Sequence, residues 1–189
     1  LLGKTFLMLL IFGTISFLFA LMWPRPLVQL LTTEAYLSTP MRPGSDTALR
    51  LLSVPLLLNA IVLYGFYVLL TKHRWKQLVY SLLVGAVIAL TLNVILIPQY
   101  GFVGAATTSI ITHTVLAIIL LPQSLRAMPM HLSRDNILRW LVFSGLLGAG
   151  LWLLVPLLKN ELFTVIGLII MSIWMGVAIL LTRLHRSLV

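Results

Sequence analysis

The sequence predicts an all-α integral membrane protein with six transmembrane helices, and two observations lead to this fold class. Of the 189 residues, 60% are hydrophobic and 9% are charged, and the mean hydropathy is +1.10. A soluble domain carries about 25% charged residues. The apolar residues also gather in stretches of about 20 residues, the length that a helix needs to cross a bilayer. Because hydrocarbon offers the backbone no hydrogen-bond partner, each stretch should be helical.

The spans are expected at residues 5–23, 51–70, 78–98, 102–121, 140–158 and 162–182. The first is free of charged residues, and Trp23 at its end is expected at the outer membrane interface, where aromatic rings prefer to lie. A short interfacial helix is expected to start within residues 32–37, capped by Thr32 or Thr33. The second span contains Pro55, which removes a backbone donor and can hinge the helix. In the last two spans, close-packing positions are expected at Gly145, Gly148, Gly150, Ser172 and Gly176.

The third and fourth spans are joined by a very short connection. The third is expected to stop at Pro98, and the chain then turns over residues 99–101. Gly101 and Gly104 supply small residues at and just after the turn, so the pattern predicts a tight helical hairpin. Within the hairpin, small and polar residues recur every four positions and so share a helix face. One stripe is Ser81, Gly85, Ala89 and Asn93; the other is Gly101, Ala105, Ser109 and His113, with Gly104, Thr108 and Thr112 alongside.

These stripes have two interpretations. Small residues let membrane helices approach closely, so the stripes can serve packing alone; alternatively, part of them lines a polar cavity. His113 lies near mid-span, where an ionisable group is costly and usually faces a bundle interior or water. It is either a proton-responsive group or a neutral histidine bonded to a neighbouring carbonyl or to Asn93. Candidate substrate-pathway residues are Asn59, Asn93, Thr108, Ser109, Thr112, His113 and Arg50, the last being an interfacial anchor unless its helix borders an outward-opening vestibule.

The basic residues predict an orientation, because Lys and Arg concentrate in cytoplasmic loops. Successive connections between the spans alternate between the two sides of the membrane. Counted in this way, nine basic residues lie on one side and four on the other. The first side holds Lys4, Lys72, Arg74, Lys76, Arg126, Arg134, Arg139, Arg183 and Arg186; the second holds Arg25, Arg42, Arg50 and Lys159. Both ends of the chain are therefore expected in the cytoplasm.

Several functions are disfavoured by what the sequence lacks. No span contains an acidic residue, so no intramembrane carboxylate pair is available for acid–base chemistry. The sequence has no HExxH, Gly-rich GK[ST] or GxSxG motif, and its four His residues lack metal-ligand spacing. We therefore expect no enzyme activity, no cofactor and no metal site. The net charge of +9 is spread between apolar runs rather than gathered on one face, so we expect no nucleic-acid partner.

Residues 51–121 resemble the C-terminal half of bacterial polysaccharide (O-antigen type) flippases, members of the multidrug/oligosaccharidyl-lipid/polysaccharide superfamily with a MATE-like fold. The most specific part of the likeness is the run from Asn93 through Gly101, NVILIPQYG, followed by Gly104, Ala105 and Ala106. Supporting segments are residues 34–37 (EAYL), residues 48–52 (ALRLL) and the basic turn at residues 72–76. The loop at residues 38–46, STPMRPGSD, is longer and richer in proline than is usual in the family.

The resemblance implies a single transmembrane domain over residues 1–189, forming one six-helix lobe of a 12–14-helix transporter whose N-terminal lobe would be a further partner. It implies movement of undecaprenyl-diphosphate-linked oligosaccharides across a bacterial inner membrane, from the cytoplasmic to the periplasmic leaflet, with the lipid-linked oligosaccharide and membrane lipids as partners. Two alternatives stay open, which are a small-molecule or drug exporter of the same fold and a membrane assembly subunit. An exporter would be expected to carry a carboxylate within a span.

Overall fold

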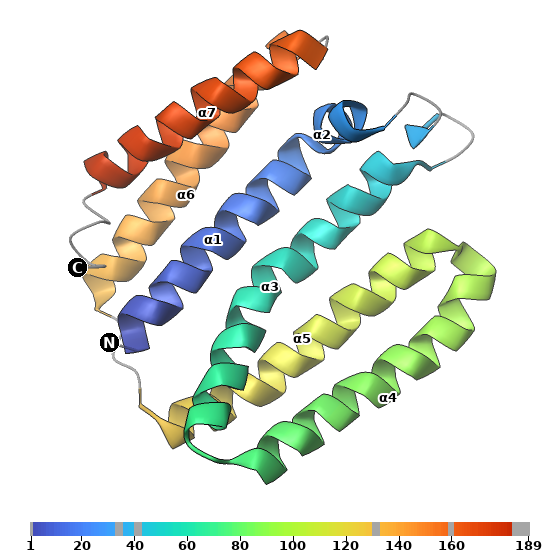
Figure 1. The fold of residues 1–189 in the computed structure, drawn as a ribbon, viewed down its shortest axis with the longest axis vertical. Coiled ribbons are helices and arrows are strands. Elements are labelled where there is room, and N and C mark those ends of the chain that lie inside the picture. Colours follow the sequence, from blue (N-terminus) through green and yellow to red (C-terminus); the bar gives the residue numbers. More distant parts are fainter. Residues whose placement is uncertain (1, 33–35, 40–42, 130–132, 159–160, 183–189) are drawn as a thin grey trace. The chain divides into compact units, whose positions relative to one another are not determined.

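The chain folds almost entirely into α-helices, in agreement with the predicted class. The structure is a computed structural model and describes residues 2–32, 36–39, 43–129, 133–158 and 161–182. In this part of the chain, six helices are long and apolar enough to cross a membrane. They are α1 (Leu2–Met22), α3 (Ser45–Thr71), α4 (Trp75–Tyr100), α5 (Phe102–Ala127), α6 (Arg134–Leu154) and α7 (Glu161–Leu181) (Figure 1).

Three of these helices extend six residues past the apolar stretches from which they were predicted. The helix α3 begins at Ser45 rather than at residue 51, α5 ends at Ala127 rather than at residue 121, and α6 begins at Arg134 rather than at residue 140. The reason at α6 is local, because Oγ of Ser133 accepts a hydrogen bond of 3.3 Å from the backbone N–H of Asp135 and so caps the helix. Capping and helix propensity act on the backbone, whereas hydropathy marks only the segment that lies in hydrocarbon.

The connection after α1 differs in part from the prediction. A short helix does form, but it is α2 (Pro24–Leu31), and Thr32 lies at its C-terminal end. The proline at the first helical position explains the start, since its missing N–H is not needed there and its φ is already helical. Of the stretch expected to be helical, residues 33–35 lie outside the described residues, Tyr36 is in a 3-10 helical conformation and Leu37 is not helical.

The hairpin between α4 and α5 is tighter than predicted. Pro98 does not end α4, which continues to Tyr100, so Gly101 alone separates the two helices. Gly101 has φ 57° and ψ −132°, a conformation that L side chains rarely adopt. A glycine is therefore required at this position for the chain to reverse within one residue.

The chain forms two compact units, and α1 and α3 contribute to both. Unit 1 consists of residues 1–13 and 54–131 and contains α4 and α5. Unit 2 consists of residues 14–53 and 132–189 and contains α2, α6 and α7.

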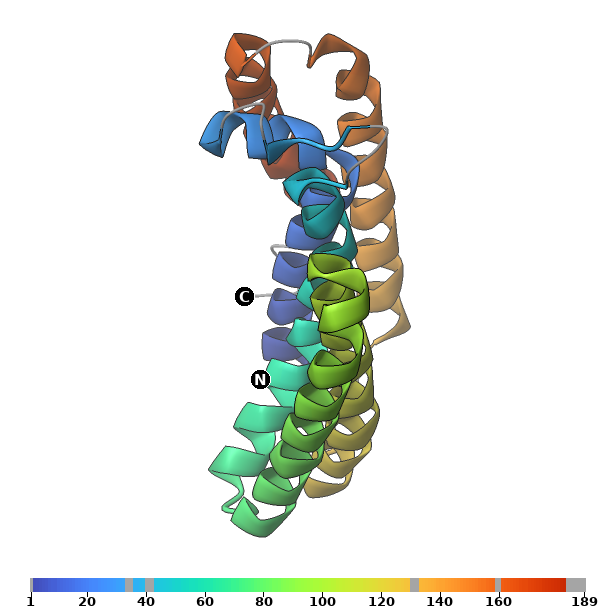
Figure 2. The same ribbon diagram turned by 90° about the vertical axis from the view of Figure 1, so that its right-hand side faces the viewer.

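Unit 1 is built around the α4–α5 hairpin, whose helices run side by side (Figure 1, Figure 2). A β-carbon added to Gly85 would lie 2.8 Å from Leu116, and one added to Gly104 would collide with the carbonyl of Leu96. The hydroxyl of Ser81 donates to the side-chain oxygen of Gln123 at 3.2 Å. These contacts place Ser81, Gly85 and Gly104 at the helix–helix interface.

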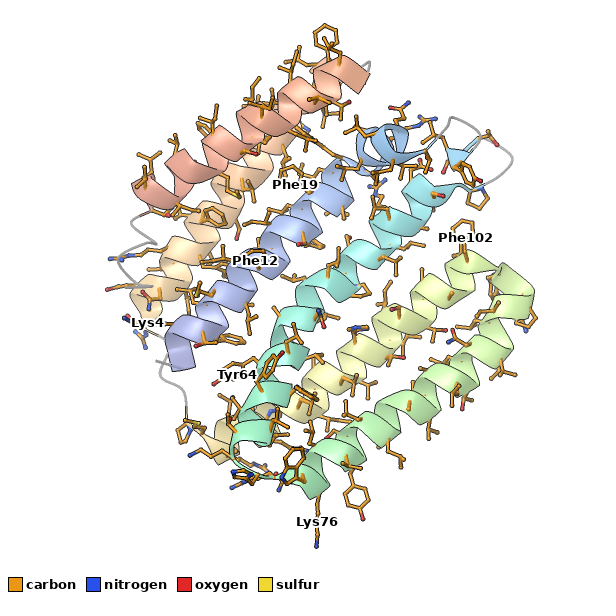
Figure 3. All side chains as sticks on the ribbon, viewed as in Figure 1. Lys4, Phe12, Phe19, Tyr64, Lys76 and Phe102 are labelled. Atoms are coloured by element: carbon orange, nitrogen blue, oxygen red, sulfur yellow. The ribbon has the colours of Figure 1, made fainter. Side chains whose placement is uncertain are left out.

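The helix α3 packs on the other side of α5 within unit 1. A β-carbon at Gly65 would lie 2.7 Å from that of Leu120, and Leu69, Leu78 and Leu120 form a buried cluster. The first half of α1 packs on α3 in turn, where the rings of Phe6 and Tyr64 meet edge-on with centroids 4.8 Å apart. At the start of α4, Lys76 projects away from the protein (Figure 3).

Unit 2 is held together by tryptophan side chains. The indole N–H of Trp23 donates to the Leu151 carbonyl at 3.0 Å, which ties the end of α1 to α6. Trp140 donates to the Thr14 hydroxyl and Trp174 to the Leu146 carbonyl, each at 3.0 Å. Trp23 is 0% exposed, so its ring packs inside the protein, where the indole N–H finds a buried acceptor. Its expected depth at the outer membrane interface stays a prediction.

The glycines of α6 and α7 that were predicted as close-packing positions differ in how closely their neighbours approach. A β-carbon at Gly150 would lie 2.6 Å from Nε1 of Trp174, so Gly150 is a close-packing position as expected. Gly145, Gly148 and Gly176 have open space around the β-carbon position among the described residues, and at these three the expectation of close packing is wrong.

Candidate functional site

The spans of the two units differ in how their polar side chains are satisfied. In unit 2, Thr14 accepts from Trp140, and the hydroxyls of Ser144 and Ser172 donate at 2.8 Å to carbonyls four residues back on their own helices. In unit 1, Thr107 and Thr114 also bond to their own helix, at 2.8 and 2.7 Å. Hydroxyl groups bonded in these ways need no further hydrogen-bond partner from their surroundings.

Three buried oxygens of unit 1 lack any hydrogen-bond partner among the described residues. They are the hydroxyls of Tyr64 on α3 and of Thr108 and Thr112 on α5. Thr108 is 2% exposed and Thr112 is 9% exposed, so both lie in the interior and do not face an open cavity. An unsatisfied buried polar group costs about 1–3 kcal/mol, so these groups lower the stability of the fold unless another molecule or a rearrangement satisfies them.

The amides of Asn59 and Asn93 are also without a hydrogen bond in the described part of the chain, and both residues are half-buried. Asn59 lies near the middle of α3. Asn93 lies eight residues before Gly101, about 12 Å along α4 from the turn at 1.5 Å per residue.

His113 is half-buried near the middle of α5, and its Nδ1 lies 2.9 Å from the carbonyl oxygen of Ser109. A carbonyl oxygen can only accept, so Nδ1 carries the proton and, in the neutral ring, Nε2 is left as an acceptor. This geometry is the neighbouring-carbonyl arrangement weighed from the sequence, and no bond to Asn93 is present in the described part. No described group bonds to Nε2.

The periodicity of α3 and α5 places Asn59 and His113 at the same level. His113 lies seven residues before Leu120, on the same face of α5, and Leu120 packs against Gly65 of α3. Asn59 lies seven residues before Phe66, which packs against the cluster containing Leu120. Both helices run in the same direction from this shared contact, so both polar residues lie about 10 Å beyond it. An amide and an imidazole acceptor, both with unused hydrogen-bonding capacity, therefore lie at one depth of the membrane domain.

The other predicted site residues fall into two groups. Gly101, Gly104 and Pro98 are structural, as described above, and Pro55 is buried within α3 without ending it. Arg50 lies in unit 2, apart from the unit that carries the remaining candidates. It is exposed and lines a cavity of about 420 Å3 together with Arg25 and Asp46.

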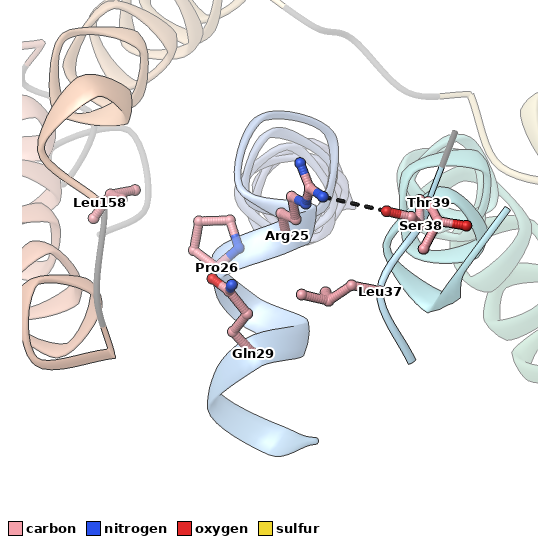
Figure 4. A pocket seen from close by; sticks show the side chains of 7 residues that line it. All are labelled: Arg25, Pro26, Gln29, Leu37, Ser38, Thr39 and Leu158. Atoms are coloured by element: carbon pink, nitrogen blue, oxygen red, sulfur yellow. Dashed lines mark hydrogen bonds between the residues drawn. The ribbon is translucent and has the colours of Figure 1, made fainter. Parts of the chain in front are cut away.

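This cavity was not predicted from the sequence, except that Arg50 was given a possible role if its helix bordered a vestibule. It adjoins a second cavity of about 400 Å3, where Arg25, Gln29 and Ser38 converge. One guanidinium nitrogen of Arg25 donates to the carbonyl oxygen of Ser38 at 3.2 Å (Figure 4). The signal in the sequence is weak, because Arg25 and Arg50 are separated by a proline-rich loop of no regular pattern.

These features define an all-α, multi-pass membrane protein. One unit has the polar side chains of Asn59 and His113 at the same depth, and the other has a cavity lined by Arg25 and Arg50. Searches of family models, curated proteins and solved structures give no match for the chain.

Proposed function

We propose that the chain is one lobe of a MATE-like flippase that moves undecaprenyl-diphosphate-linked oligosaccharides across a bacterial inner membrane. The resemblance at residues 93–106 suggests this family. The six membrane-length helices and the one-residue hairpin turn at Gly101 agree with it. A second lobe would complete the transport cavity, and the lobes would rock about it in alternating access.

The observation that carries the proposal is the set of unused hydrogen-bonding groups in unit 1. A membrane-spanning helix that only packs in lipid has no use for Asn59, Asn93 and the free nitrogen of His113 at half-buried positions. A sugar headgroup presents many hydroxyls, each able to donate and accept, so amides and a neutral imidazole are suitable partners. The absence of a carboxylate from the spans disfavours the exporter alternative, which would bind a cation.

The direction of transport is inferred from the distribution of basic residues between the two sides of the membrane. The nine basic residues on the side of Lys4 and Lys76, against four on the other, favour cytoplasmic termini. In this orientation the basic cavity with Arg25 and Arg50 faces the periplasm, where the translocated headgroup would arrive.

The first test is the reading frame upstream of residue 1. The proposal expects it to continue and to encode six or more further apolar spans, and the complete protein is then used for transport. A stop codon immediately upstream would require two copies of this chain to form the cavity, which crosslinking in membranes would have to demonstrate for the proposal to survive.

The transport test uses proteoliposomes loaded with a fluorescent polyprenyl-diphosphate oligosaccharide, with leaflet location measured by dithionite bleaching. His113→Asn is the informative variant, because the asparagine amide can still donate to the Ser109 carbonyl while the acceptor at Nε2 is lost. We expect at least a tenfold slower transport for His113→Asn and for Asn59→Leu. The matched control is Thr107→Val on the same helix, whose hydroxyl is already bonded to Val103 and whose loss should leave the rate unchanged. Wild-type rates in both variants, or no transport by the complete protein, would refute the proposal.

A further inference from the structure

Arg25 and Arg50 line one cavity at the outer end of unit 2, which Asp46 also borders. Both side chains are exposed and border the cavity of about 420 Å3. Neither forms an ion pair with a described residue, and the guanidinium group of Arg50 has no hydrogen bond within the described part of the chain. Two guanidinium groups with unused donors in one concave space form an anion-binding arrangement.

The carboxylate of Asp46, which also borders the cavity, is hydrogen-bonded to Ser38 and not to an arginine. Asp46 stands four residues before Arg50 on α3, the spacing at which a helical ion pair normally forms. Instead, Oδ1 of Asp46 accepts from the backbone N–H of Ser38 at 2.8 Å and from the Ser38 hydroxyl at 2.5 Å. The carboxylate therefore closes the loop and does not pair with either arginine.

Ser38 fixes this arrangement from several directions. Its hydroxyl also accepts from the backbone N–H of Gly44 at 2.8 Å and lies 2.7 Å from the hydroxyl of Thr47. Its carbonyl accepts from Arg25. A β-carbon at Gly44 would overlap the backbone around Ser38, so Gly44 and Ser38 are in close contact, and one of the two arginines is held in place by this serine.

Apart from the arginines, Asp46 and Thr47, the lining of the cavity is apolar. It includes Met22, Pro24, Val155 and Leu158, at the ends of α1, α6 and the adjoining η2 helix (Val155–Leu157). A cavity that combines two arginines with apolar side chains at the end of membrane helices suits a phosphate group attached to a lipid chain better than a free anion. Arginine binds phosphate oxygens in a two-pronged geometry that lysine cannot offer.

We propose that Arg25 and Arg50 bind the phosphate or diphosphate group of a lipid at the outer face of unit 2. The source is either the isoprenoid diphosphate of the transported substrate, which rests on the function proposed above, or an anionic phospholipid of the surrounding leaflet. The site itself requires only the two arginines and Ser38, whose carbonyl holds Arg25.

The test measures binding to the purified protein in detergent micelles by microscale thermophoresis. The probes are farnesyl diphosphate, dihexanoyl phosphatidic acid and inorganic pyrophosphate. Arg50→Gln is the principal variant, because the Arg50 side chain makes no hydrogen bond in the described structure and its loss should not disturb the hydrogen bonds of Ser38. The double variant Arg25→Gln/Arg50→Gln removes both groups. The matched control is Arg74→Gln/Arg126→Gln, which removes two exposed arginines of unit 1.

We expect farnesyl diphosphate to bind, with at least tenfold weaker binding in Arg50→Gln, a larger loss in the double variant and no change in the control. Preferential binding of farnesyl diphosphate assigns the site to the isoprenoid substrate. Equal binding of phosphatidic acid with the same arginine dependence supports the site but assigns it to bulk phospholipid, whether or not transport is observed. Absence of binding by both lipids, an equal effect in the control, or unchanged binding in the double variant would overturn the proposal.

Discussion

At the scale of single residues, the hydroxyl groups of this protein occupy two different energetic situations. Thr14 accepts a hydrogen bond from Trp140 in unit 2, whereas Thr108 and Thr112 are buried in unit 1 without a partner among the described residues. The same side chain is therefore stabilising at one site and costly at the others. A costly group that serves packing alone is replaceable, and this gives a direct way to separate a structural from a functional role.

We expect Thr108→Val and Thr112→Val to leave the free energy of unfolding unchanged or to raise it by about 1 kcal/mol, because each removes an unsatisfied hydroxyl and keeps the shape. Thr14→Val should lower it by about 1 kcal/mol, because the Trp140 N–H loses its acceptor. Unfolding by SDS titration from mixed micelles measures all three. Destabilisation by the two α5 substitutions equal to that of Thr14→Val would mean that these hydroxyls are satisfied by a group outside the described structure.

At the scale of elements, the α4–α5 hairpin depends on two glycines that meet different kinds of atoms. At Gly104 an added methyl group would meet the backbone of Leu96, which cannot move without displacing α4. At Gly85 it would meet the end of the Leu116 side chain, which can change rotamer. The two positions therefore tolerate alanine differently although both lie in the same interface.

Gly104→Ala should destabilise the protein by about 3 kcal/mol, at the upper end of the range for overpacking, and Gly85→Ala by about 1 kcal/mol or less. The thermal unfolding midpoint in detergent, followed by tryptophan fluorescence, ranks the two variants. A control is Gly145→Ala on α6, where the β-carbon position is open and alanine should be neutral or slightly stabilising in a helix interior. Equal effects at Gly85 and Gly104 would contradict the distinction between side-chain and backbone contacts.

Hydropathy alone predicted the existence and order of the six spans, because burial in hydrocarbon selects apolar residues over a fixed length. It did not predict helix ends, which depend on local bonds such as the cap by Ser133, or α2, which depends on Pro24 at the first helical position. The candidate site was predicted in part, since residue spacing identifies the α5 stripe but cannot reveal that Asn59 of another helix shares its level with His113. The outer cavity depends on the loop closed by Ser38, a tertiary arrangement without a periodic signal.

At the scale of the whole molecule, orientation in the membrane links the two proposals. The positions of Asn59 and His113 in unit 1 do not distinguish the two sides of the membrane. The cavity with Arg25 and Arg50 does, because it meets a translocated headgroup only if it faces the periplasm. The charge asymmetry of nine against four predicts this orientation. The absence of cysteine from the sequence makes the orientation directly measurable, because single-cysteine variants need no prior removal of native thiols.

The two ends of α4 provide a matched pair, since Gln77 and Gln99 are both exposed and lie on the same helix, about 33 Å apart at 1.5 Å per residue. In intact spheroplasts, a membrane-impermeant maleimide should label Gln99→Cys and should label Gln77→Cys only after permeabilisation. The reverse pattern would place the basic side outside and would contradict both the positive-inside assignment and the proposed direction of transport. Labelling of both variants without permeabilisation would show that α4 does not cross the membrane, because a spanning helix keeps one end protected by the bilayer.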